Sequence, residues 1–405
     1  MTTEITKILE GFKQFSENPY EDSVKFLREY IEVEPSSEAF FELGKALFLN
    51  GDYGESINSL EKSADSRSNA YIGLDYYRMN NHPNAIRHFK EFLNENRNET
   101  ILSYLMLSHE KNMDWRNAIV CGEELLEMNP KNDSVKIHLI DYHCNLKEYE
   151  KSLNYLNELD DKKLNYRKGL ILFKLKRFDE AIEMLKTIKT VEAYRLMSKS
   201  YEKINKPQKA IMSLMNAYEL NKDTEILLEV SKISFNNQYH KHAIQILEDI
   251  LREDSKNERA LEKIAENYFE LQKFELVRSY WEDLLKVNVK NLKAYLLLSE
   301  TYPYLNDIEK AMKYADKGLE IHPKSAALWI QKAWVHYYED LDEFKRAFEM
   351  ALKLEPNNIE NHLCLIGECI YWDDMDDAHR YYERLMLYNP TFSKSFDEIR
   401  KDNMW

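Results

Sequence analysis

The sequence predicts an all-helical protein, a stack of about twelve similar helix pairs arranged end to end. Three observations support this fold class. A polar turn followed by a small residue recurs along the chain, the apolar residues on either side of it have helical spacing, and glycine and proline number only nine each. Repeats of this kind form α-solenoids, in which each unit packs against its neighbours.

The recurrence is clearest when the small residue after each turn is taken as an anchor. Ser56, Ala85 and Ala118, for example, end the turns "GDYGES", "NHPNA" and "MDWRNA", and successive anchors are separated by 29, 33 or 34 residues. A period this steady indicates copies of one supersecondary unit. The full set is Ser23, Ser56, Ala85, Ala118, Ser152, Ala181, Ala210, Ala243, Val277, Ala311 and Ala378, with Phe344 in the gap before the last.

Each repeat is expected to hold two amphipathic helices. In residues 292–325, Leu298 and Tyr302 lie on the apolar side of a first helix, and Ala311 and Ala315 lie on that of a second. Small residues are expected where the axes of two paired helices approach closely, because a larger side chain would push the pair apart. In the first helices these residues are Gly44, Gly73, Gly169, Ser198, Ser231, Ala265 and Ser299.

Two features modify the pattern. Three of the steps between anchors have 29 residues, so the second helix or the loop after it should be shorter there. Two of these steps are adjacent, from Ser152 to Ala181 and from Ala181 to Ala210, and should narrow any groove at that place. Phe344 stands where a small anchor is expected, which predicts an irregular turn before it.

The pattern resembles the tetratricopeptide repeat (TPR) family. The 34-residue period, the small residue after the turn, the aromatic and alanine positions that flank it, and the late proline all match, and Trp329 supplies the tryptophan that the family often carries early in the first helix. The resemblance covers about residues 3–391. It implies one continuous right-handed superhelix over residues 1–405, with a concave groove lined by first helices and a final capping helix at about 393–405.

Composition and charge narrow the classes of partner. The net charge of −15 argues against nucleic acid or an anionic membrane as the main partner. The N-terminus "MTTEITKILEGFKQF" lacks the apolar run of a secretory signal, and four sparse cysteines suit a reducing compartment. These observations predict a cytoplasmic location.

Motifs for catalysis or for holding a metal or cofactor are missing. No phosphate-binding glycine loop, nucleophile elbow or zinc-binding H-E-x-x-H occurs. Cys364 and Cys369 do not converge on one helix face, "HKH" (240–242) has poor chelating geometry, and "WDDMDDAH" (372–379) lacks the spacing of a calcium loop. We therefore expect no enzyme activity, no metal and no cofactor.

One segment has an unusual charge. Residues 162–209, the basic island, contain 14 Lys or Arg and five Asp or Glu, a local charge of +9, while the rest of the chain carries −24. Lys163, Arg167 and Lys174 have the spacing of one helix face, and the face would line the groove. Equivalent positions of the next two repeats are also basic, aromatic residues border the same face, and Glu202 is the one acidic residue there. The candidate site is Lys163, Tyr166, Arg167, Phe173, Lys174, Arg195, Lys199 and Lys232.

Two other binding modes fit less well. Many TPR proteins hold a chaperone C-terminus through a carboxylate clamp, and Lys163 and Arg167 match its last element, but Ser103, Leu107 and His138 stand where other ligands are needed. Near the C-terminus, Trp334 and Tyr337 also fall on groove-facing positions. Because aromatic residues at helical spacing are usually core, we interpret these two as core.

The predicted function is a non-enzymatic scaffold or adaptor, whose groove binds an acidic or phosphorylated segment of a protein partner through charge-assisted hydrogen bonds. A lysine-rich surface facing outward would give the same charge pattern, and a nucleic-acid or lipid head-group site is a further alternative. The alternative function is a regulatory subunit of an enzyme complex, for example one that makes glycans or cell-envelope polymers, which docks a catalytic partner.

Overall fold

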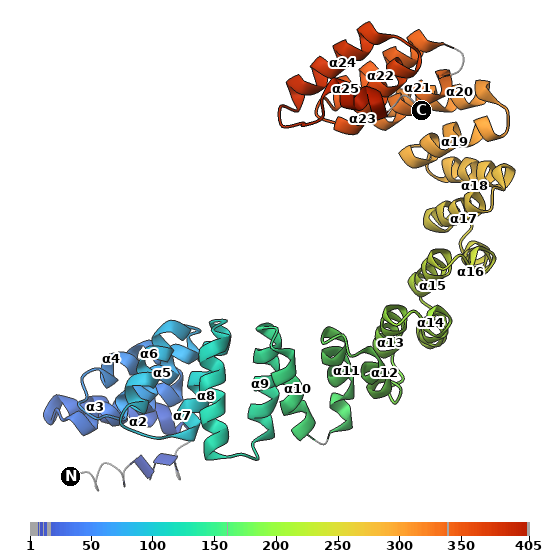
Figure 1. Cartoon of the computed structure of the whole chain (residues 1–405). Coiled ribbons are helices and arrows are strands. Elements are labelled where there is room, and N and C mark those ends of the chain that lie inside the picture. Colours follow the sequence, from blue (N-terminus) through green and yellow to red (C-terminus); the bar gives the residue numbers. More distant parts are fainter. Residues whose placement is uncertain are drawn as a thin grey trace. The chain divides into compact units, whose positions relative to one another are not determined.

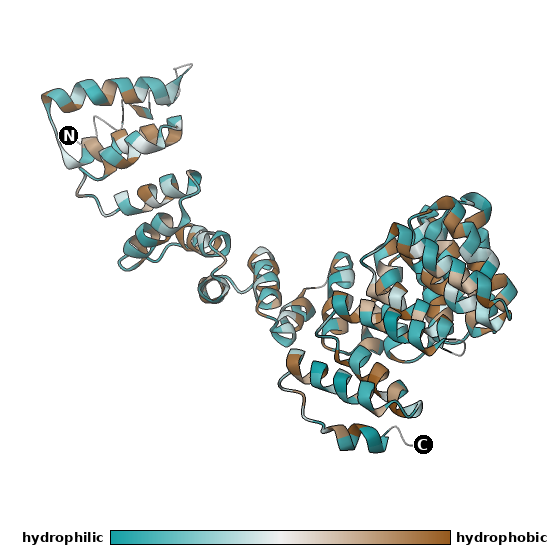
Figure 2. Cartoon of the chain, turned by 90° about the horizontal axis from the view of Figure 1, so that it is seen from above, coloured by the Kyte–Doolittle hydropathy of each residue, from teal (hydrophilic) through white to brown (hydrophobic). Residues whose placement is uncertain are grey.

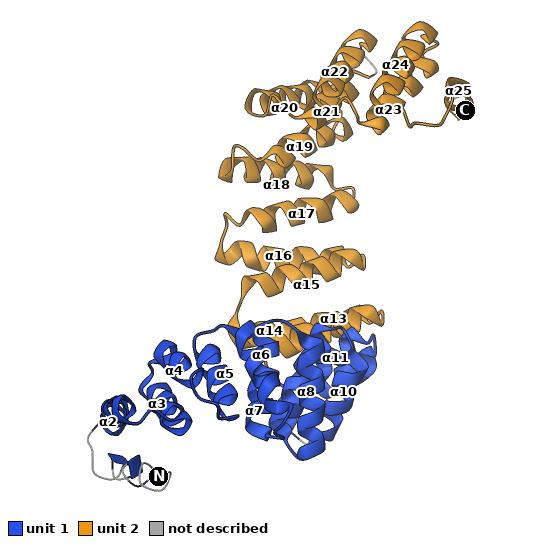
Figure 3. Ribbon diagram, turned by 90° about the vertical axis from the view of Figure 1, so that its left-hand side faces the viewer, with its two compact units in different colours: residues 1–189 blue, residues 190–405 orange. Residues whose placement is uncertain are grey.

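In a computed structural model, every regular element within the described residues is a helix (Figure 1). The described residues are 7, 9–10, 12–13, 18–159, 161–337 and 340–402. Contacts divide the chain into two compact units, residues 1–189 (unit 1) and 190–405 (unit 2), which we describe separately (Figure 3). The predicted all-helical repeat fold is confirmed, whereas one continuous superhelix over residues 1–405 stays a prediction.

Unit 1 is a row of helix pairs, each made of a first helix, a tight turn and a second helix. The predicted first helix of the first repeat, from about residue 3, lies mostly outside the described residues, and α2 (Pro19–Val33) follows it. The next pairs are α3 (Ser37–Asn50) with α4 (Tyr53–Leu60), α5 (Ser68–Arg78) with α6 (His82–Leu93), α7 (Glu99–Lys111) with α8 (Trp115–Met128), and α9 (Asp133–Asn145) with α10 (Tyr149–Glu158). The last pair is α11 (Asn165–Lys174) with α12 (Phe178–Leu185), preceded by the 3-10 helix η1 (Lys162–Leu164).

Unit 2 continues the same plan. Its pairs are α13 (Val191–Lys203) with α14 (Pro207–Asn221), α15 (Thr224–Asn236) with α16 (His240–Glu253), α17 (Glu258–Glu270) with α18 (Phe274–Val287), α19 (Leu292–Tyr304) with α20 (Ile308–Ile321), α21 (Ala326–His336) with α22 (Leu341–Leu354), and α23 (Ile359–Tyr371) with α24 (Met375–Tyr388). The predicted capping helix is confirmed as α25 (Phe396–Asp402), which contacts α23 and buries Phe396 and Ile399 in the last core cluster. Residues 403–405 lie outside the described residues.

The turn has one backbone geometry in the ten pairs whose turn residues are all described. The residue five before the anchor adopts a left-handed conformation, with φ of +93° at Gly51 and between +54° and +62° at its equivalents. The amide that follows then reaches back to the helix, as when Asn81 N donates to Tyr76 O at 2.8 Å, which satisfies an end carbonyl of the first helix. The residues are Gly51, Asn80, Met113, Lys147, Lys176, Asn205, Gln238, Gln272, Asn306 and Asp373.

Small residues do lie where paired helices approach. A Cβ atom added at Gly73 would come within 2.5 Å of the ring of Phe89, and one added at Gly169 would come within 2.8 Å of Leu185. No carbon atom fits at such distances without movement of its neighbour. The prediction from the sequence is therefore confirmed at these positions. Figure 2 shows that hydrophobic and hydrophilic residues alternate along the helices.

The predicted shortening of the three 29-residue repeats is also confirmed. Their second helices, α4, α10 and α12, have 8, 10 and 8 residues. The second helices α6, α8, α14, α16, α18, α20, α22 and α24 have 12 to 15 residues. The missing residues thus come from the C-terminal end of the second helix, because the turn and anchor keep their register.

Phe344 occupies the anchor position itself. Helix α22 begins three residues before it, as second helices do in the other pairs, and the Phe344 ring is fully buried against Trp334 and Phe348. Two residues of the turn that was predicted to be irregular, 338 and 339, lie outside the described residues. A large anchor is accommodated here by a cluster of aromatic rings.

Candidate functional site

Within each unit, the first helices of neighbouring repeats lie side by side and are linked by ion pairs. In unit 2, Arg195 of α13 pairs with Glu229 of α15 at 3.2 Å, and Lys293 of α19 pairs with Glu266 of α17 at 2.6 Å. Arg259 of α17 pairs with a carboxylate of α15. We call the surface that these helices share the first-helix face of unit 2.

The basic island crosses the boundary between the two units, so its halves are described separately. In unit 1, Lys163 lies in η1, where its amide donates to Asp161 Oδ1 at 2.8 Å, and α11 begins two residues later. Lys163 and Lys174 are exposed, and Tyr166 is partly buried. Phe173 packs its ring edge against Phe178, with 5.4 Å between centroids, so it belongs partly to the core.

Arg167 is already paired in unit 1. Its guanidinium group contacts Asp141 of α9, the preceding first helix. Burial lowers the pKa of Arg167 from its usual value, which reflects the cost of removing this cation from water. Arg167 therefore links two first helices, and an acidic ligand would have to compete with Asp141 for it.

In unit 2, Arg195 is paired as well, but two lysines are not. Arg195 lies 3.5 Å from Asp223 and 3.2 Å from Glu229. Lys199 of α13 and Lys232 of α15 are exposed and form no ion pair with any described residue. Burial raises the pKa of the neighbouring Glu202, although Lys232 and Lys199 oppose this effect, so one carboxylate interrupts the positive surface.

Lys232 borders a hollow that the sequence did not reveal. The α15–α17 hollow has a volume of about 340 Å³ and lies between two first helices. Lys232 and Phe235 of α15 and Lys263 of α17 line it, and Lys263 pairs with Glu266 at 2.7 Å. The full lining is Leu228, Ser231, Lys232, Phe235, Asn236, Arg259, Lys263, Glu266 and Asn267.

A second hollow follows along the first-helix face of unit 2. The α17–α19 hollow has a volume of about 190 Å³ and is lined by Phe235, Glu266, Phe269, Glu270, Trp281, Leu297 and Glu300. Its lining includes three carboxylates and no Lys or Arg among the described residues. It therefore differs in charge from the α15–α17 hollow, although the two share Phe235 and Glu266.

A signal in the sequence points to both hollows. Lys199, Lys232, Glu266 and Glu300 each stand eleven residues before the anchor of their repeat, so they occupy one structural position in four successive first helices. This position changes from two cations to two anions along unit 2. Comparing equivalent positions across repeats, instead of totalling charge over a segment, would have found Glu266 and Glu300.

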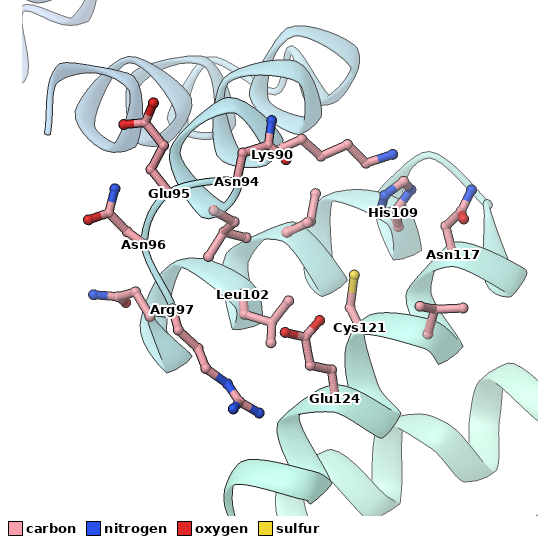
Figure 4. Close-up of a pocket in the computed structure, with 14 residues that line it drawn as sticks. Lys90, Asn94, Glu95, Asn96, Arg97, Leu102, His109, Asn117, Cys121 and Glu124 are labelled. Atoms are coloured by element: carbon pink, nitrogen blue, oxygen red, sulfur yellow. The ribbon is translucent and has the colours of Figure 1, made fainter. Parts of the chain in front are cut away.

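A hollow of unit 1 lies between second helices α6 and α8 (Figure 4). It has a volume of about 670 Å³, and Figure 4 shows the loop from Asn94 to Arg97 on one side with His109 and Asn117 on the other. Asp114 Oδ2 lies 3.0 Å from His109 Nδ1 and accepts from Asn117 Nδ2 at 2.7 Å. These polar groups of the lining are thus engaged in holding the turn before α8.

The aromatic residues near the C-terminus differ in part from the interpretation as core. Trp334 packs against Phe344 and Phe348, with centroids 5.6 Å and 5.9 Å away, but 37% of its surface is exposed. Tyr337 lies beside it, with 5.4 Å between ring centroids. Trp334 thus combines a core contact with a solvent-exposed edge.

Metal sites and membrane spans are both missing from the described part of the chain. No group of three or more His, Cys, Asp or Glu side chains among the described residues is placed to hold a metal ion. No described helix has the length and hydropathy needed to cross a membrane.

Comparison with protein families finds repeats in both units. Residues 37–69, which hold α3 and α4, and residues 292–325, which hold α19 and α20, match the model described as tetratricopeptide repeat. Residues 111–188 match the model described as anaphase-promoting complex, cyclosome, subunit 3. No curated protein matches the chain in sequence.

Solved structures share the fold at low sequence identity. A chain in "Structure of Naa15/Naa10 bound to HypK-THB" is 13% identical, with a TM-score of 0.50, and the match covers 98% of this chain and 70% of that one. The C-terminal part of a TPR repeat-containing protein from Cytophaga hutchinsonii is 18% identical, with a TM-score of 0.45 and coverage of 59% and 99%. Yeast Tom70 is 14% identical, with a TM-score of 0.39 and coverage of 98% and 94%. Repeat models match segments of both units, and the helix pairs are built alike from α3 to α24. The resemblance to the tetratricopeptide repeat family is therefore confirmed, and the chain contains tetratricopeptide repeats at residues 37–69 and 292–325.

Proposed function

We propose that the chain is a non-enzymatic interaction scaffold, which binds an acidic or phosphorylated segment of a protein partner on its first helices. A row of first helices offers a long surface for a partner segment. A cytoplasmic location is part of this proposal. The basic island at residues 162–209 is the part of the surface to which we assign the acidic ligand.

One observation carries the proposal. Lys199 and Lys232 occupy equivalent positions on adjacent first helices, both are exposed, and neither pairs with any described carboxylate. Exposed cations without a paired carboxylate need break no ion pair when a ligand binds, and they can form charge-assisted hydrogen bonds with its carboxylate or phosphate oxygens. The aromatic ring of Phe235 in the adjoining hollow offers apolar contact beside them.

The remaining candidate residues have supporting roles in this proposal. Lys163 and Lys174 are exposed cations of unit 1, and Tyr166 offers partly buried aromatic surface. Arg167 and Arg195 are paired with carboxylates of neighbouring first helices. They therefore contribute positive potential at fixed positions, and fewer of their N–H groups are free to donate hydrogen bonds to a ligand. Phe173 supports α11 from the core side.

The test is a selection of peptides on the full chain. A random peptide library displayed on phage is panned against the wild type and against the double variant Lys199→Glu with Lys232→Glu. We expect the wild type to enrich peptides rich in Asp or Glu, which also mimic phosphorylated residues. The variant should bind those peptides at least about tenfold more weakly. Because both lysines are exposed and form no ion pair, the unfolding midpoint should fall only slightly, through the lost attraction to Glu202.

Lys241→Glu is the matched control. Lys241 is exposed on the second helix α16, so this variant carries the same kind of charge change away from the first-helix face. Binding should remain near the wild-type level in this control and should weaken steeply with added salt in the wild type. Equal loss of binding in control and double variant, or no acidic peptides in the wild-type selection, would contradict the proposal.

A further inference from the structure

We propose that the α17–α19 hollow binds the guanidinium group of an arginine in the same partner segment whose acidic part lies on Lys199 and Lys232. This inference rests on the proposed function and adds a second requirement to the ligand. It predicts a segment with two charge signs, acidic where it crosses α13 and α15 and basic where it crosses α17 and α19.

The lining of the hollow selects a cation. Glu266, Glu270 and Glu300 contribute three carboxylates from two adjacent first helices, and no described basic residue lines the hollow with them. A cationic side chain that enters it gains opposite charge from more than one direction in a partly desolvated place, where electrostatic interactions are stronger than in water.

Glu266 and Glu300 differ in what already neutralises them. Glu266 accepts from Lys263 at 2.7 Å and from Lys293 at 2.6 Å; burial acts to raise its pKa, but these hydrogen bonds outweigh burial and the pKa is lowered. Glu300 is partly buried, pairs with no described cation, and burial raises its pKa. Glu300 is thus a carboxylate that has lost some water and gained no partner, a condition that an incoming cation would relieve.

The size and walls of the hollow favour arginine over a larger ligand or over lysine. About 190 Å³ is below the usual range of drug-sized ligand pockets, about 300 to 1,000 Å³, and suits one long side chain. Phe235 and Phe269 are partly buried and provide aromatic surface next to the carboxylates, whereas Trp281 is fully buried in the wall. A planar guanidinium group can stack on such rings while it donates to a carboxylate, whereas an ammonium group is a compact, strongly hydrated charge.

The order of charges along unit 2 supports a ligand of two signs. Equivalent positions in α13, α15, α17 and α19 hold Lys199, Lys232, Glu266 and Glu300 in turn. A uniformly acidic segment that continued past α15 would meet Glu266, Glu270 and Glu300 and be repelled. A ligand that is complementary to all four positions must therefore be acidic beside Lys199 and Lys232 and basic beside Glu266 and Glu300.

The experiment repeats the peptide selection with the full chain and with Glu300→Gln, an isosteric change that removes the charge. The wild type should enrich peptides that contain arginine at a fixed distance from an acidic cluster. Glu300→Gln should keep the acidic cluster and lose the arginine. In a second peptide, the selected arginine is replaced by citrulline, which has the same shape and no charge. The wild type should bind the citrulline peptide about tenfold more weakly than the arginine peptide, whereas Glu300→Gln should bind the two peptides equally well.

Glu320→Gln is the control, because Glu320 is exposed on the second helix α20 and does not line the hollow. It should discriminate between arginine and citrulline as the wild type does. Acidic peptides without fixed arginine, fixed lysine in place of arginine, or the same discrimination in Glu300→Gln would overturn the inference and leave the proposed function intact. Failure to enrich any charged peptide would contradict both.

Discussion

The interior of the helix pairs and the first-helix face of unit 2 differ in what the repeats hold constant. In the interior, size is nearly constant: glycine, alanine or serine recurs at the crossing points and at the anchors other than Val277 and Phe344, and Gly73 and Gly169 have no room for a Cβ atom. On the first-helix face, charge varies, from Lys199 and Lys232 to Glu266 and Glu300 at one structural position. Packing requires shape to repeat, whereas the surface is free to vary, so variation at equivalent positions marks the residues available to a partner.

The largest effect on stability should come from the interior. Gly73→Val places its Cβ atom 2.5 Å from the ring of Phe89, which is fully buried and cannot move away freely. We expect a loss of about 3 kcal/mol in the free energy of unfolding, measured by urea unfolding with circular dichroism. Gly54→Ala is the control, because no heavy atom lies within 4 Å of its added Cβ, and it should be neutral or stabilising. Equal effects of the two changes would break the comparison.

A buried carboxyl group in the interior should make stability depend on pH. Asp75 is fully buried, its Oδ2 accepts from Ser56 Oγ at 2.7 Å, and Oδ1 has no partner among the described residues. Burial raises the pKa of Asp75 to about 7, although the hydrogen bond from Ser56 opposes the shift. Between the unfolded pKa, near 4, and the folded value, unfolding releases a proton, so stability falls by up to about 1.4 kcal/mol per pH unit as pH rises.

Asp75→Asn removes this titration. The variant should match the wild type near pH 3, where Asp75 is protonated in both states, and exceed it by up to about 4 kcal/mol at pH 8. Urea unfolding at several pH values measures the difference. A stability difference that stays constant from pH 4 to pH 8 would mean that Asp75 does not titrate in this range.

A smaller effect is expected at the turns. Lys176 has a φ of +62°, a conformation that costs a residue with a side chain about 1 kcal/mol, so Lys176→Gly should stabilise by up to that amount. Asn205 has the same geometry, and since asparagine tolerates it better, Asn205→Gly should gain only a few tenths of a kcal/mol. Thermal unfolding of both variants measures the two gains in stability and compares them. A larger gain at Asn205 than at Lys176 would contradict this account.

The fold could be predicted from the sequence because helix packing requires small and apolar residues at regular intervals along the chain. The anchors, the glycines at crossing points and the three shortened second helices all follow from period and residue size. The left-handed conformation of the turn residue could not be predicted from the sequence in every repeat. Glycine and asparagine, as at Gly51 and Asn205, favour this conformation, but Met113 and Lys176 are residue types that do not. In those repeats the shared fold imposes the conformation on residues that do not prefer it.

The candidate site was less predictable, because ion pairs depend on the neighbouring repeat. Helical spacing placed Arg167 and Arg195 on first helices, but it could not show that Asp141 and Glu229 already neutralise them. Their carboxylates come from adjacent repeats, and the rotation between repeats decides which side chains meet. The two hollows could not be predicted for the same reason, because their walls come from successive helices whose relative rotation the sequence does not give.

The central claim is that a charged partner segment lies on the first-helix face of unit 2. Lysine methylation of the full chain, read by mass spectrometry with and without a selected acidic peptide, tests it directly. We predict that labelling falls at Lys199 and Lys232 and stays unchanged at Lys209 and Lys241, which are exposed on the second helices α14 and α16. Protection of Lys209 and Lys241 without protection of Lys199 and Lys232 would contradict the account.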